Sequence, residues 1–425
     1  MKFAELNLPD VVLQGIKDAG FEALTAVQEE SIPLALRGKD VAAQAQTGTG
    51  KTAAFLISLF CKLLSSGKQT SNNPRALVMA PTRELVVQIV ADAELLGKHT
   101  GLKVQAIFGG VDYEKQRQAL RDGVDIIVAT PGRLIDYYKQ RVFSMNRVEA
   151  LVIDEADRMF DMGFIKDLRY ILRQLPTYEQ RQTMLFSATL SPQVMELAYE
   201  FMNLAEKVQI EPEKRTADNI DQVLYHVTRR EKFALLLGLL KQEAGVERVM
   251  LFVNTKVEAE RLSALLNVNE IPSAVLSGDI PQAKRMRILD QFKLGSLTHL
   301  VATDVASRGI HVDNVTHVIN YDLPQDREDY VHRIGRTARA GALGRAISFA
   351  DEEMVYVLEE IEDYLGKRIP SEIPCDEDFI FSYKRAVPKR KKPPEKPAAD
   401  ASKRRRPPRR RGPSKPSGDR STPKG

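Results

Sequence analysis

Residues 45–52 (Ala-Gln-Thr-Gly-Thr-Gly-Lys-Thr) and residues 152–157 (Val-Ile-Asp-Glu-Ala-Asp) decide the fold of this chain. In the first stretch, glycines let successive backbone N–H groups face one phosphate, the lysine reaches the outer phosphates, and a threonine hydroxyl can ligate Mg²⁺. In the second stretch, two carboxylates follow an apolar run, where they can hold Mg²⁺ through water and orient an attacking water. Together the two stretches predict a nucleoside triphosphate site.

The phosphate turn departs from the strict pattern at one position, because Ala45 stands where glycine is usual. We expect Thr52 and Asp154 to hold Mg²⁺ and Glu155 to orient the attacking water. The residues expected to hold the phosphates are Ala45, Gln46, Thr47, Gly48, Thr49, Gly50, Lys51 and Thr52.

Length and composition limit the class of protein. The chain has 425 residues, 43% of them hydrophobic, which is enough for two or three domains with buried cores. Its two cysteines, Cys61 and Cys375, can build neither a disulfide framework nor a cysteine metal cluster, as is typical of the reducing cytoplasm. The N-terminal residues lack the apolar core of a signal peptide, and no apolar run approaches membrane-spanning length. We therefore expect a cytoplasmic protein with no membrane partner.

Short apolar runs alternate with longer helical stretches in two blocks of the chain. The runs include residues 75–80, 104–108, 124–129, 150–153 and 183–186 in the first block, and 223–227, 248–253, 273–276, 298–302, 315–320 and 346–349 in the second. Consecutive apolar residues are typical of parallel strands covered by helices on both faces. We therefore expect an α/β fold, with one domain over residues 1–209, a polar linker over 210–219 and a second domain over 220–370.

Residues 371–425 form a segment rich in Lys, Arg and Pro. From Lys384 to Gly425 the sequence has 17 Lys and Arg against 3 Asp and Glu, so the rest of the chain carries a net charge of −9. Such a composition cannot bury enough apolar surface to offset chain entropy, and we expect a largely disordered basic tail. The tail would suit an electrostatic arm for nucleic acid, although a solubilising tail without a specific partner has the same composition.

The acidic motif also identifies a family. Asp154-Glu155-Ala156-Asp157 is the signature of the DEAD-box ATP-dependent RNA helicases, and further motifs in that family's order occur across residues 3–340. The chain resembles this family, which implies two tandem RecA-like domains with parallel sheets, holding ATP and Mg²⁺ between them and RNA across them. Residues 154–167 and 320–339 are most similar to a bacterial subgroup, which implies a role in RNA degradation and an endoribonuclease scaffold as partner.

The resemblance assigns the adenine base to a site near the N-terminus. Gln28 can form a bidentate pair with the N6 and N7 edge of adenine, a geometry that guanine cannot match. Phe3 and Phe21 offer aromatic faces for stacking or for flanking packing. By itself Gln28 would be read as an ordinary helix residue. Leu24 and Ala26 replace two prolines usual in this motif, which should alter the turn more than the amide contact.

Two further motifs complete the expected catalytic machinery. The resemblance implies that Ser187-Ala188-Thr189 couples hydrolysis to strand separation, although hydroxyls at a strand end often serve only as turn hydrogen-bonders. In the stretch His332–Arg339, the resemblance makes Arg336 and Arg339 arginine fingers against charge on the γ-phosphate. The alternative for this stretch is a basic surface helix. The catalytic residues expected are Glu155, Asp154, Lys51, Arg336, Arg339, His332, Ser187 and Thr189.

One position departs from the family in a consequential way. His311 stands where the family usually has an aspartate that accepts a hydrogen bond from the ATP ribose. A neutral histidine can still accept one hydrogen bond, but it is bulkier and titrates near neutral pH. We therefore expect a nucleotide affinity that is weaker than usual or dependent on a partner.

The expected RNA contacts lie at strand ends in both halves. Glycines permit close backbone approach, hydroxyl and N–H groups bond phosphates, and arginines supply charge. Such contacts follow the sugar–phosphate path, so little sequence preference is expected, and each residue alone would be read as a turn or helix start. The preference for RNA over DNA rests on the resemblance. The residues are Pro81, Thr82, Arg83, Gly109, Gly110, Thr130, Gly132, Arg133, Gly278, Arg285 and Thr303.

The sequence therefore predicts an ATP-dependent RNA helicase that remodels RNA by RNA-stimulated ATP hydrolysis and domain closure. Two other classes remain open: an ATP-driven DNA translocase on the same plan, and an RNA-binding adaptor of a ribonuclease complex with weak ATPase activity. A small-molecule kinase is disfavoured, because it gives no reason for a second α/β domain that carries arginine fingers.

Overall fold

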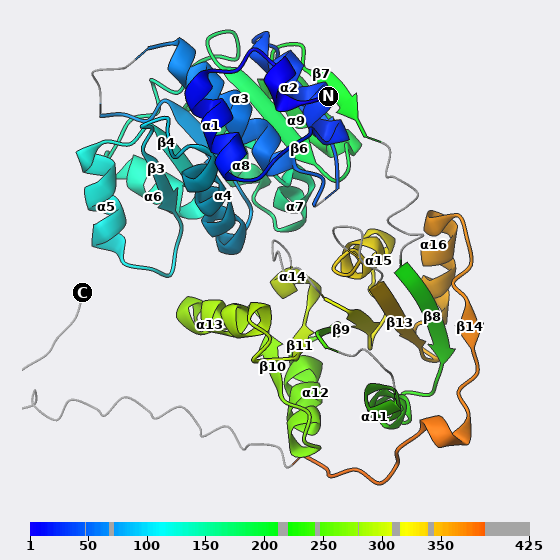
Figure 1. The fold of residues 1–425 in the computed structure, drawn as a ribbon. Helices are drawn as coiled ribbons and strands as arrows, with labels where there is room; N and C mark the ends of the chain where they lie inside the picture. The colour runs from blue at the N-terminus through cyan, green and yellow to red at the C-terminus, as the bar shows by residue number, and fades with distance from the viewer. Residues whose placement is uncertain are drawn as a thin grey trace, which may run out of the picture. The chain divides into compact units, whose positions relative to one another are not determined.

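The computed structural model describes residues 1–46, 48–67, 72–210, 220–242, 247–278, 280–307, 315–338 and 344–386. Within these ranges the chain forms two seven-stranded sheets whose neighbouring strands all run parallel (Figure 1). The strand orders are β3-β4-β2-β5-β6-β1-β7 and β10-β11-β9-β12-β13-β8-β14. Adding seven to each number of the first order gives the second, so the same topology occurs twice. The predicted fold class of two tandem RecA-like parallel-sheet domains is confirmed.

The first sheet and its helices account for the chain up to residue 210. The strands are β1 (Val41–Gln44), β2 (Ala76–Met79), β3 (Val104–Ile107), β4 (Ile126–Ala129), β5 (Ala150–Ile153), β6 (Gln182–Ser187) and β7 (Glu206–Gln209). The helices are η1 (Phe3–Glu5), α1 (Asp10–Asp18), α2 (Ala26–Leu36), α3 (Lys51–Ser65), α4 (Arg83–Leu96), α5 (Tyr113–Asp122), α6 (Pro131–Lys139), α7 (Ala156–Asp161), α8 (Ile165–Leu172) and α9 (Pro192–Phe201).

The second sheet begins at residue 220. Its strands are β8 (Ile220–His226), β9 (Val249–Phe252), β10 (Ser273–Leu276), β11 (His299–Ala302), β12 (His317–Asn320), β13 (Gly344–Ala350) and β14 (Ser371–Glu372). The helices are α11 (Lys232–Gln242), α12 (Lys256–Val268), α13 (Gln282–Lys293), α14 (Asp304–Ser307), α15 (Arg327–Ile334), α16 (Val355–Leu365) and η3 (Asp376–Asp378).

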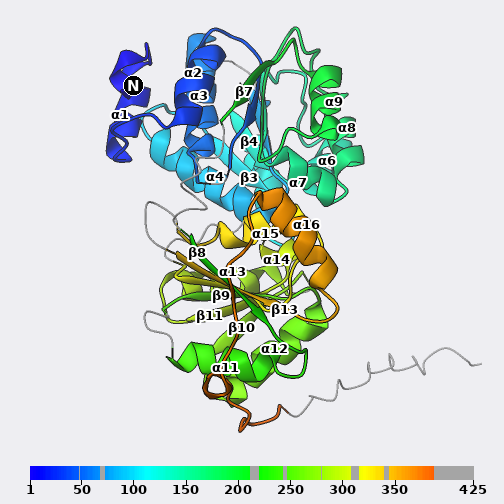
Figure 2. The same ribbon diagram turned by 90° about the vertical axis from the view of Figure 1, so that its right-hand side faces the viewer.

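Apolar cores lie on both faces of each sheet, as consecutive apolar strand residues predict. In the first sheet, α1 to α4 bury their side chains on one face, and α6, α8 and α9 bury theirs on the other (Figure 2). In the second sheet, α11 and α12 cover one face, while α13, α15 and α16 contribute to the cores of the other. The carboxyl ends of the strands are left for loops, and these loops carry the motifs.

A buried carboxylate fixes the start of β1 in the sheet. Asp40 accepts hydrogen bonds of 2.7 Å from the backbone N–H groups of Thr183 and Asn203, and its own carbonyl accepts one of 2.8 Å from Glu206. Burial nevertheless raises the pKa of Asp40, because these two donors offset only part of the desolvation. The interactions tie the chain before β1 to both neighbouring strands. They thereby fix the position of β1, and so of the phosphate turn that follows it, relative to the neighbouring strands.

The predicted domain boundaries need one correction. Residues 371–386, which the sequence assigns to the disordered tail, are ordered against the second sheet. Phe379, Ile380 and Tyr383 pack on the core that α11 and α12 cover, and the backbone carbonyl of Asp378 lies so close to Gly238 that a side chain there would overlap it. A few apolar residues in a polar stretch are enough for this docking. The basic residues beyond 386, and the predicted linker except Ile210, lie outside the described residues.

In the described part of the chain, no helix combines the length and the apolar character needed to cross a membrane.

Helix α1 approaches α4 closely at Gly15, and this contact can be tested. An added Cβ at Gly15 would overlap the carbonyl oxygen of Leu96, whereas a Cβ at Gly132 would meet no atom within 4 Å. We expect Gly15→Ala to destabilise the fold by about 1–3 kcal/mol, because the two backbones must separate. The midpoint of urea unfolding, followed by circular dichroism, measures the effect. Gly132→Ala is the matched control and should lose nothing; equal midpoints would contradict the proposed contact.

Candidate functional site

The phosphate turn lies between β1 and the fifteen-residue helix α3. Gly48 and Gly50 have φ angles of 86° and 89°, in the left-handed region that glycine adopts without strain. The Thr49 hydroxyl donates to the Gln46 carbonyl over 2.8 Å, and Ala45 extends the strand by donating its N–H to the Ser187 carbonyl over 2.9 Å. Ala45 thus continues the strand's hydrogen bonding one residue beyond β1 and has no positive φ, so the position does not require glycine. Thr47 lies outside the described residues.

Three charged side chains are buried where the turn meets the end of β5. Lys51, Asp154 and Glu155 are only 6%, 2% and 5% exposed. Neither Lys51 Nζ nor Glu155 Oε2 has a hydrogen-bond partner among the described residues. Buried polar atoms are normally satisfied, and each orphan costs about 1–3 kcal/mol. The arrangement therefore fits a charged ligand that supplies the missing partners.

Asp154 shows the electrostatic character of this corner. Burial raises the pKa of Asp154 to about 6; the Glu155 carboxylate adds to the rise, and the Lys51 ammonium opposes it. Its Oδ1 accepts a 2.9 Å hydrogen bond from the Glu155 backbone N–H. A cation beside Asp154 would restore the ionised form, so the buried carboxylates and the Thr52 hydroxyl fit a hard divalent ion. Glu155 itself adopts φ 49°, an uncommon angle for a residue with a side chain.

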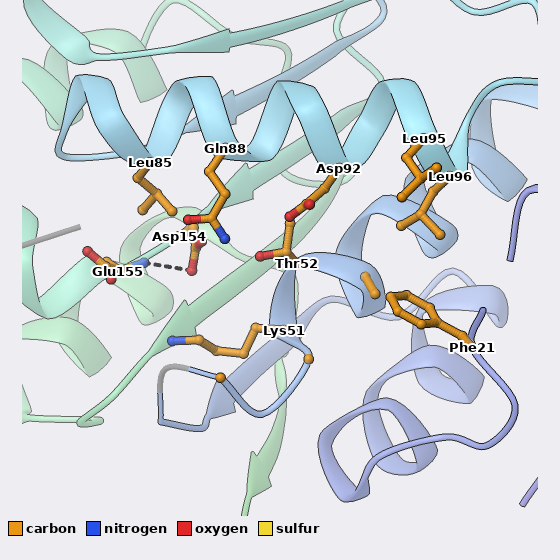
Figure 3. Close-up of a pocket in the computed structure, with 13 residues that line it drawn as sticks. Phe21, Lys51, Thr52, Leu85, Gln88, Asp92, Leu95, Leu96, Asp154 and Glu155 are labelled. Atoms are coloured by element: carbon orange, nitrogen blue, oxygen red, sulfur yellow. Dashed lines mark hydrogen bonds between the residues drawn. The ribbon is translucent and has the colours of Figure 1, made fainter. Parts of the chain in front are cut away.

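These residues line one elongated pocket (Figure 3). The phosphate turn and the acidic pair contribute Gly48, Gly50, Lys51, Thr52, Asp154 and Glu155, and the loop after α1 contributes Phe21. Helix α4 supplies five lining residues that sequence reasoning missed: Leu85, Gln88, Asp92, Leu95 and Leu96. Leu85, Gln88 and Asp92 follow one another at three or four residues, and Leu95 and Leu96 lie three and four residues after Asp92. This spacing is the signal that could have found them, since it places them on one helix face.

The residues predicted to read adenine lie beside the turn. Gln28 is buried; its Oε1 accepts from the Thr25 N–H over 3.0 Å, and its Nε2 donates to the Gly50 carbonyl over 3.1 Å. Phe21 is 41% exposed and lines the pocket, while Phe3 is buried and stacks behind it with ring centroids 6.4 Å apart. Of the two roles left open for the aromatics, Phe3 takes flanking packing. Gln28 holds the phosphate turn to helix α2.

The Ser187-Ala188-Thr189 stretch is tied to the acidic motif. The Asp157 carboxylate accepts 3.1 Å hydrogen bonds from the backbone N–H groups of Ala188 and Thr189, and the Asp157 N–H donates to the Ser187 hydroxyl over 3.1 Å. Two loops at neighbouring strand ends, β5 and β6, are thereby joined. A shift of one loop must move the other.

The predicted RNA-binding residues of the first half follow β2, β3 and β4. Thr82 caps α4 by accepting from the Leu85 N–H, and Arg83 lies against Gly109 and Gly110. The Arg133 guanidinium stacks over the ring of Tyr113, 4.9 Å from its centroid. Thr130 is the N-cap of α6 and Gly132 lies in its first turn, which leaves a second helix N-terminus at this edge. Pro81 lies two residues after the end of β2. Adjacent helix N-termini and two arginines are suited to a phosphate backbone.

The second half also carries a buried basic residue that the sequence did not single out. Arg333 is 1% exposed; it donates two hydrogen bonds, of 2.6 and 2.7 Å, to the Asp304 carboxylate and bonds Asn254 and Asn320. It anchors α15, the helix that precedes Arg336. His332 lies 3.7 Å from Asp329 on the same helix. Arg333 fell within the quoted basic motif, so its position was visible although its structural role was not.

Among the remaining predicted residues of the second half that the structure describes, all are buried except Gly278, which is exposed. Arg336 and Thr303 are buried, and Gly278 lies in a turn. Arg285 is buried and donates one hydrogen bond to the Ala306 carbonyl. Arg339 and His311 lie outside the described residues.

Comparison with known proteins agrees with this geometry. Residues 25–197 match the DEAD/DEAH box helicase family, and residues 231–341 match the helicase conserved C-terminal domain. The ATP-dependent RNA helicase RhlB of Shewanella oneidensis is 52% identical over 373 residues, covering 87% of this chain and 84% of the relative. That of Idiomarina loihiensis is 51% identical over 371 residues, covering 87% of each chain.

Solved structures give the same result. The chain resembles S. cerevisiae Dbp5 bound to RNA and ADP BeF3, with a TM-score of 0.77 and 31% identity over 88% of this chain and 95% of the other. It also resembles Mss116p bound to ssRNA and AMP-PNP, with a TM-score of 0.78 and 31% identity over 88% and 80% of the two chains. The expected family, enzyme class and fold are therefore confirmed. The chain belongs to the DEAD/DEAH box helicase family.

Proposed function

We propose that this helicase opens or remodels RNA locally, by coupling RNA-stimulated ATP hydrolysis to closure of its two α/β halves. The observation that carries the proposal is the pair of buried, unpartnered atoms, Lys51 Nζ and Glu155 Oε2, in one pocket with Asp154. A triphosphate oxygen would accept a hydrogen bond from Lys51 Nζ, and the attacking water would donate one to Glu155 Oε2. The relatives named ATP-dependent RNA helicases support RNA as the polymer.

The phosphate turn would bind the triphosphate through backbone N–H groups and the N-terminus of α3, with Lys51 reaching the outer phosphates. Thr52 and Asp154 would hold Mg²⁺, which supplies positive charge against the phosphate oxygens when bound. Phe21 would stack on the base. Gln28 would read the edge of the base only if its amide exchanged the present bonds to Thr25 and Gly50 for bonds to the ligand. Glu155, whose free carboxylate oxygen faces the same pocket, would orient the attacking water and accept its proton.

The second half would add positive charge to that of Lys51 in the first half. We assign Arg336 and Arg339 to the γ-phosphate as it is cleaved, with His332 beside them, and Arg333 to positioning Arg336 through α15. Because Arg336 follows a helix fixed by buried hydrogen bonds, its approach requires the whole half to move as a unit. ATP would therefore promote closure, and hydrolysis would release it.

RNA would bind along the strand ends of both halves. In the first half the N-termini of α4 and α6, with Arg83 and Arg133, would contact the sugar–phosphate path; in the second, Gly278, Arg285 and Thr303 would do so. Closure would bend one strand so that it no longer fits a duplex. The Asp157 bonds to Ala188 and Thr189 would transmit the change between the nucleotide and that strand.

The high identity to the RhlB relatives also supports a proposal about the cellular role of the chain. We assign the chain to RNA degradation in the cytoplasm, with an endoribonuclease scaffold as its partner.

Replacement of Glu155 tests the catalytic assignment. We expect Glu155→Gln to lower RNA-stimulated ATP hydrolysis by roughly 100-fold or more, because the amide cannot accept the water's proton. Binding of ATP and RNA should persist, so the variant should stay trapped on RNA. Steady-state phosphate release and RNA filter binding measure the two properties. Glu114→Gln, on the exposed surface of α5, is the control. A Glu155→Gln enzyme that turns over normally would refute the role.

The polymer class is tested by matched oligonucleotides. We expect single-stranded RNA to stimulate ATP hydrolysis several-fold more than DNA of the same sequence, because 2′-hydroxyl contacts distinguish the two. Phosphate release at saturating oligonucleotide gives the comparison. Equal stimulation would favour a DNA translocase, and no stimulation by either would favour an adaptor with weak ATPase activity.

The basic tail is tested by ending the chain at Ala386, which keeps the ordered residues 371–386. We expect weaker RNA binding and a shallower dependence of affinity on salt, because fewer counterions are released. Basal ATP hydrolysis should be unchanged. A chain of full length in which the tail's Lys and Arg are replaced by Gln is the matched control and should behave like the truncation. An unchanged salt slope in both would exclude the tail as an RNA arm.

A further inference from the structure

Helix α4 places one carboxylate in the nucleotide pocket that the proposed mechanism does not use. Among the α4 residues that line this pocket, Leu85, Leu95 and Leu96 are apolar and Gln88 is neutral. Asp92 alone is acidic, and it lies one helical turn from both Gln88 and Leu96. In Figure 3 its carboxylate points down from α4 toward the side of Thr52.

No described residue satisfies this carboxylate. Asp92 is half-buried, and within the described ranges it has neither a hydrogen-bond donor nor an ion-pair partner. Burial raises the pKa of Asp92 to about 6, and no compensating interaction opposes the rise. A ligand that donates a hydrogen bond to this carboxylate would stabilise its ionised form.

The surroundings restrict what that donor is. At one end of the pocket are Lys51 and the acidic pair, and at the other are Phe21, Leu95 and Leu96 (Figure 3). A phosphate beside Asp92 would meet like charge, and the apolar end offers a surface for the base. The part of a nucleotide that joins these two ends is its sugar. Ribose carries two neighbouring hydroxyl donors, and a carboxylate carries two acceptor oxygens.

We propose that Asp92 is a sugar-recognition residue, whose carboxylate accepts hydrogen bonds from the ribose hydroxyls of the bound nucleotide. The proposal rests on the proposed function, since it needs the phosphates on the turn and the base against Phe21. Asp92 thereby makes the first half, by itself, selective for ribonucleotides over deoxyribonucleotides. It is a binding residue and takes no part in the cleavage of the γ-phosphate.

Binding measurements on the full chain, without RNA and at pH 8 where Asp92 is ionised, test the proposal. The probes are ADP, 2′-deoxy-ADP and 3′-deoxy-ADP, followed by isothermal titration calorimetry. We expect the wild type to bind ADP roughly tenfold more tightly than at least one deoxy analogue, the effect of one hydrogen bond to a charged group. Asp92→Ala should weaken ADP binding roughly tenfold and leave that analogue's affinity unchanged, so that discrimination disappears.

The controls separate sugar recognition from other roles. Glu94→Gln, on the exposed face of the same helix, should retain wild-type discrimination, and circular dichroism should show all variants folded. Equal weakening of all three ligands in Asp92→Ala would overturn the proposal, because it would indicate a packing or metal-linked role. Retained discrimination in that variant would overturn it as well. A wild type that binds none of the ligands would overturn the proposed nucleotide site along with this inference.

Discussion

The nucleotide site depends on charged groups that the fold removes from water without pairing them. Lys51 Nζ and Glu155 Oε2 are buried orphans, and Asp154 beside them has its pKa raised by burial. Each such unpartnered group costs about 1–3 kcal/mol, and a bound triphosphate with its Mg²⁺ would supply the missing partners. The rest of the first half can be understood as the framework that holds these groups in place. The strained backbone of Glu155 is part of the same cost.

The strand order explains how the framework does this. Strand β6 lies between β1, which leads into the phosphate turn, and β5, which leads into the acidic pair. The loop after β6 is therefore adjacent to both the phosphate turn and the acidic pair. The Asp157 carboxylate accepts hydrogen bonds from two backbone N–H groups of this loop, those of Ala188 and Thr189. Ser187 accepts from Asp157, and its carbonyl also accepts from Ala45. A change at the nucleotide can thus reach the Ser187–Thr189 loop through backbone hydrogen bonds, without a long side-chain path.

Sequence patterns predicted those parts of the structure that depend on local chemistry. Apolar runs located most of the strands, and the glycine-rich turn and the acidic pair located the site, because both motifs require particular residue types at fixed spacing. What the patterns missed depends on tertiary contact. Asp92 lines the pocket only because α4 packs beside α3, and residues 379–383 are ordered only because a complementary surface exists. Likewise, Gln28 could be placed at the site, but its bonds to Thr25 and Gly50 could not.

The two halves share one topology but differ at the helix that follows their first strand. In each half the helix after the first strand begins with a lysine, Lys51 in α3 and Lys232 in α11. Lys232 is fully buried, but it donates to Asp322 over 3.0 Å and pairs with Asp351 at 2.7 Å. Burial alone would raise the pKa of Asp351, yet the hydrogen bond and charge of Lys232 lower it. The charge of this lysine is thus neutralised by carboxylates in the second half, whereas the equivalent Lys51 Nζ has no partner among the described residues. An ammonium held by two carboxylates has no positive charge left for a phosphate, so in the proposed mechanism the second half would act on the nucleotide through other residues, such as Arg336.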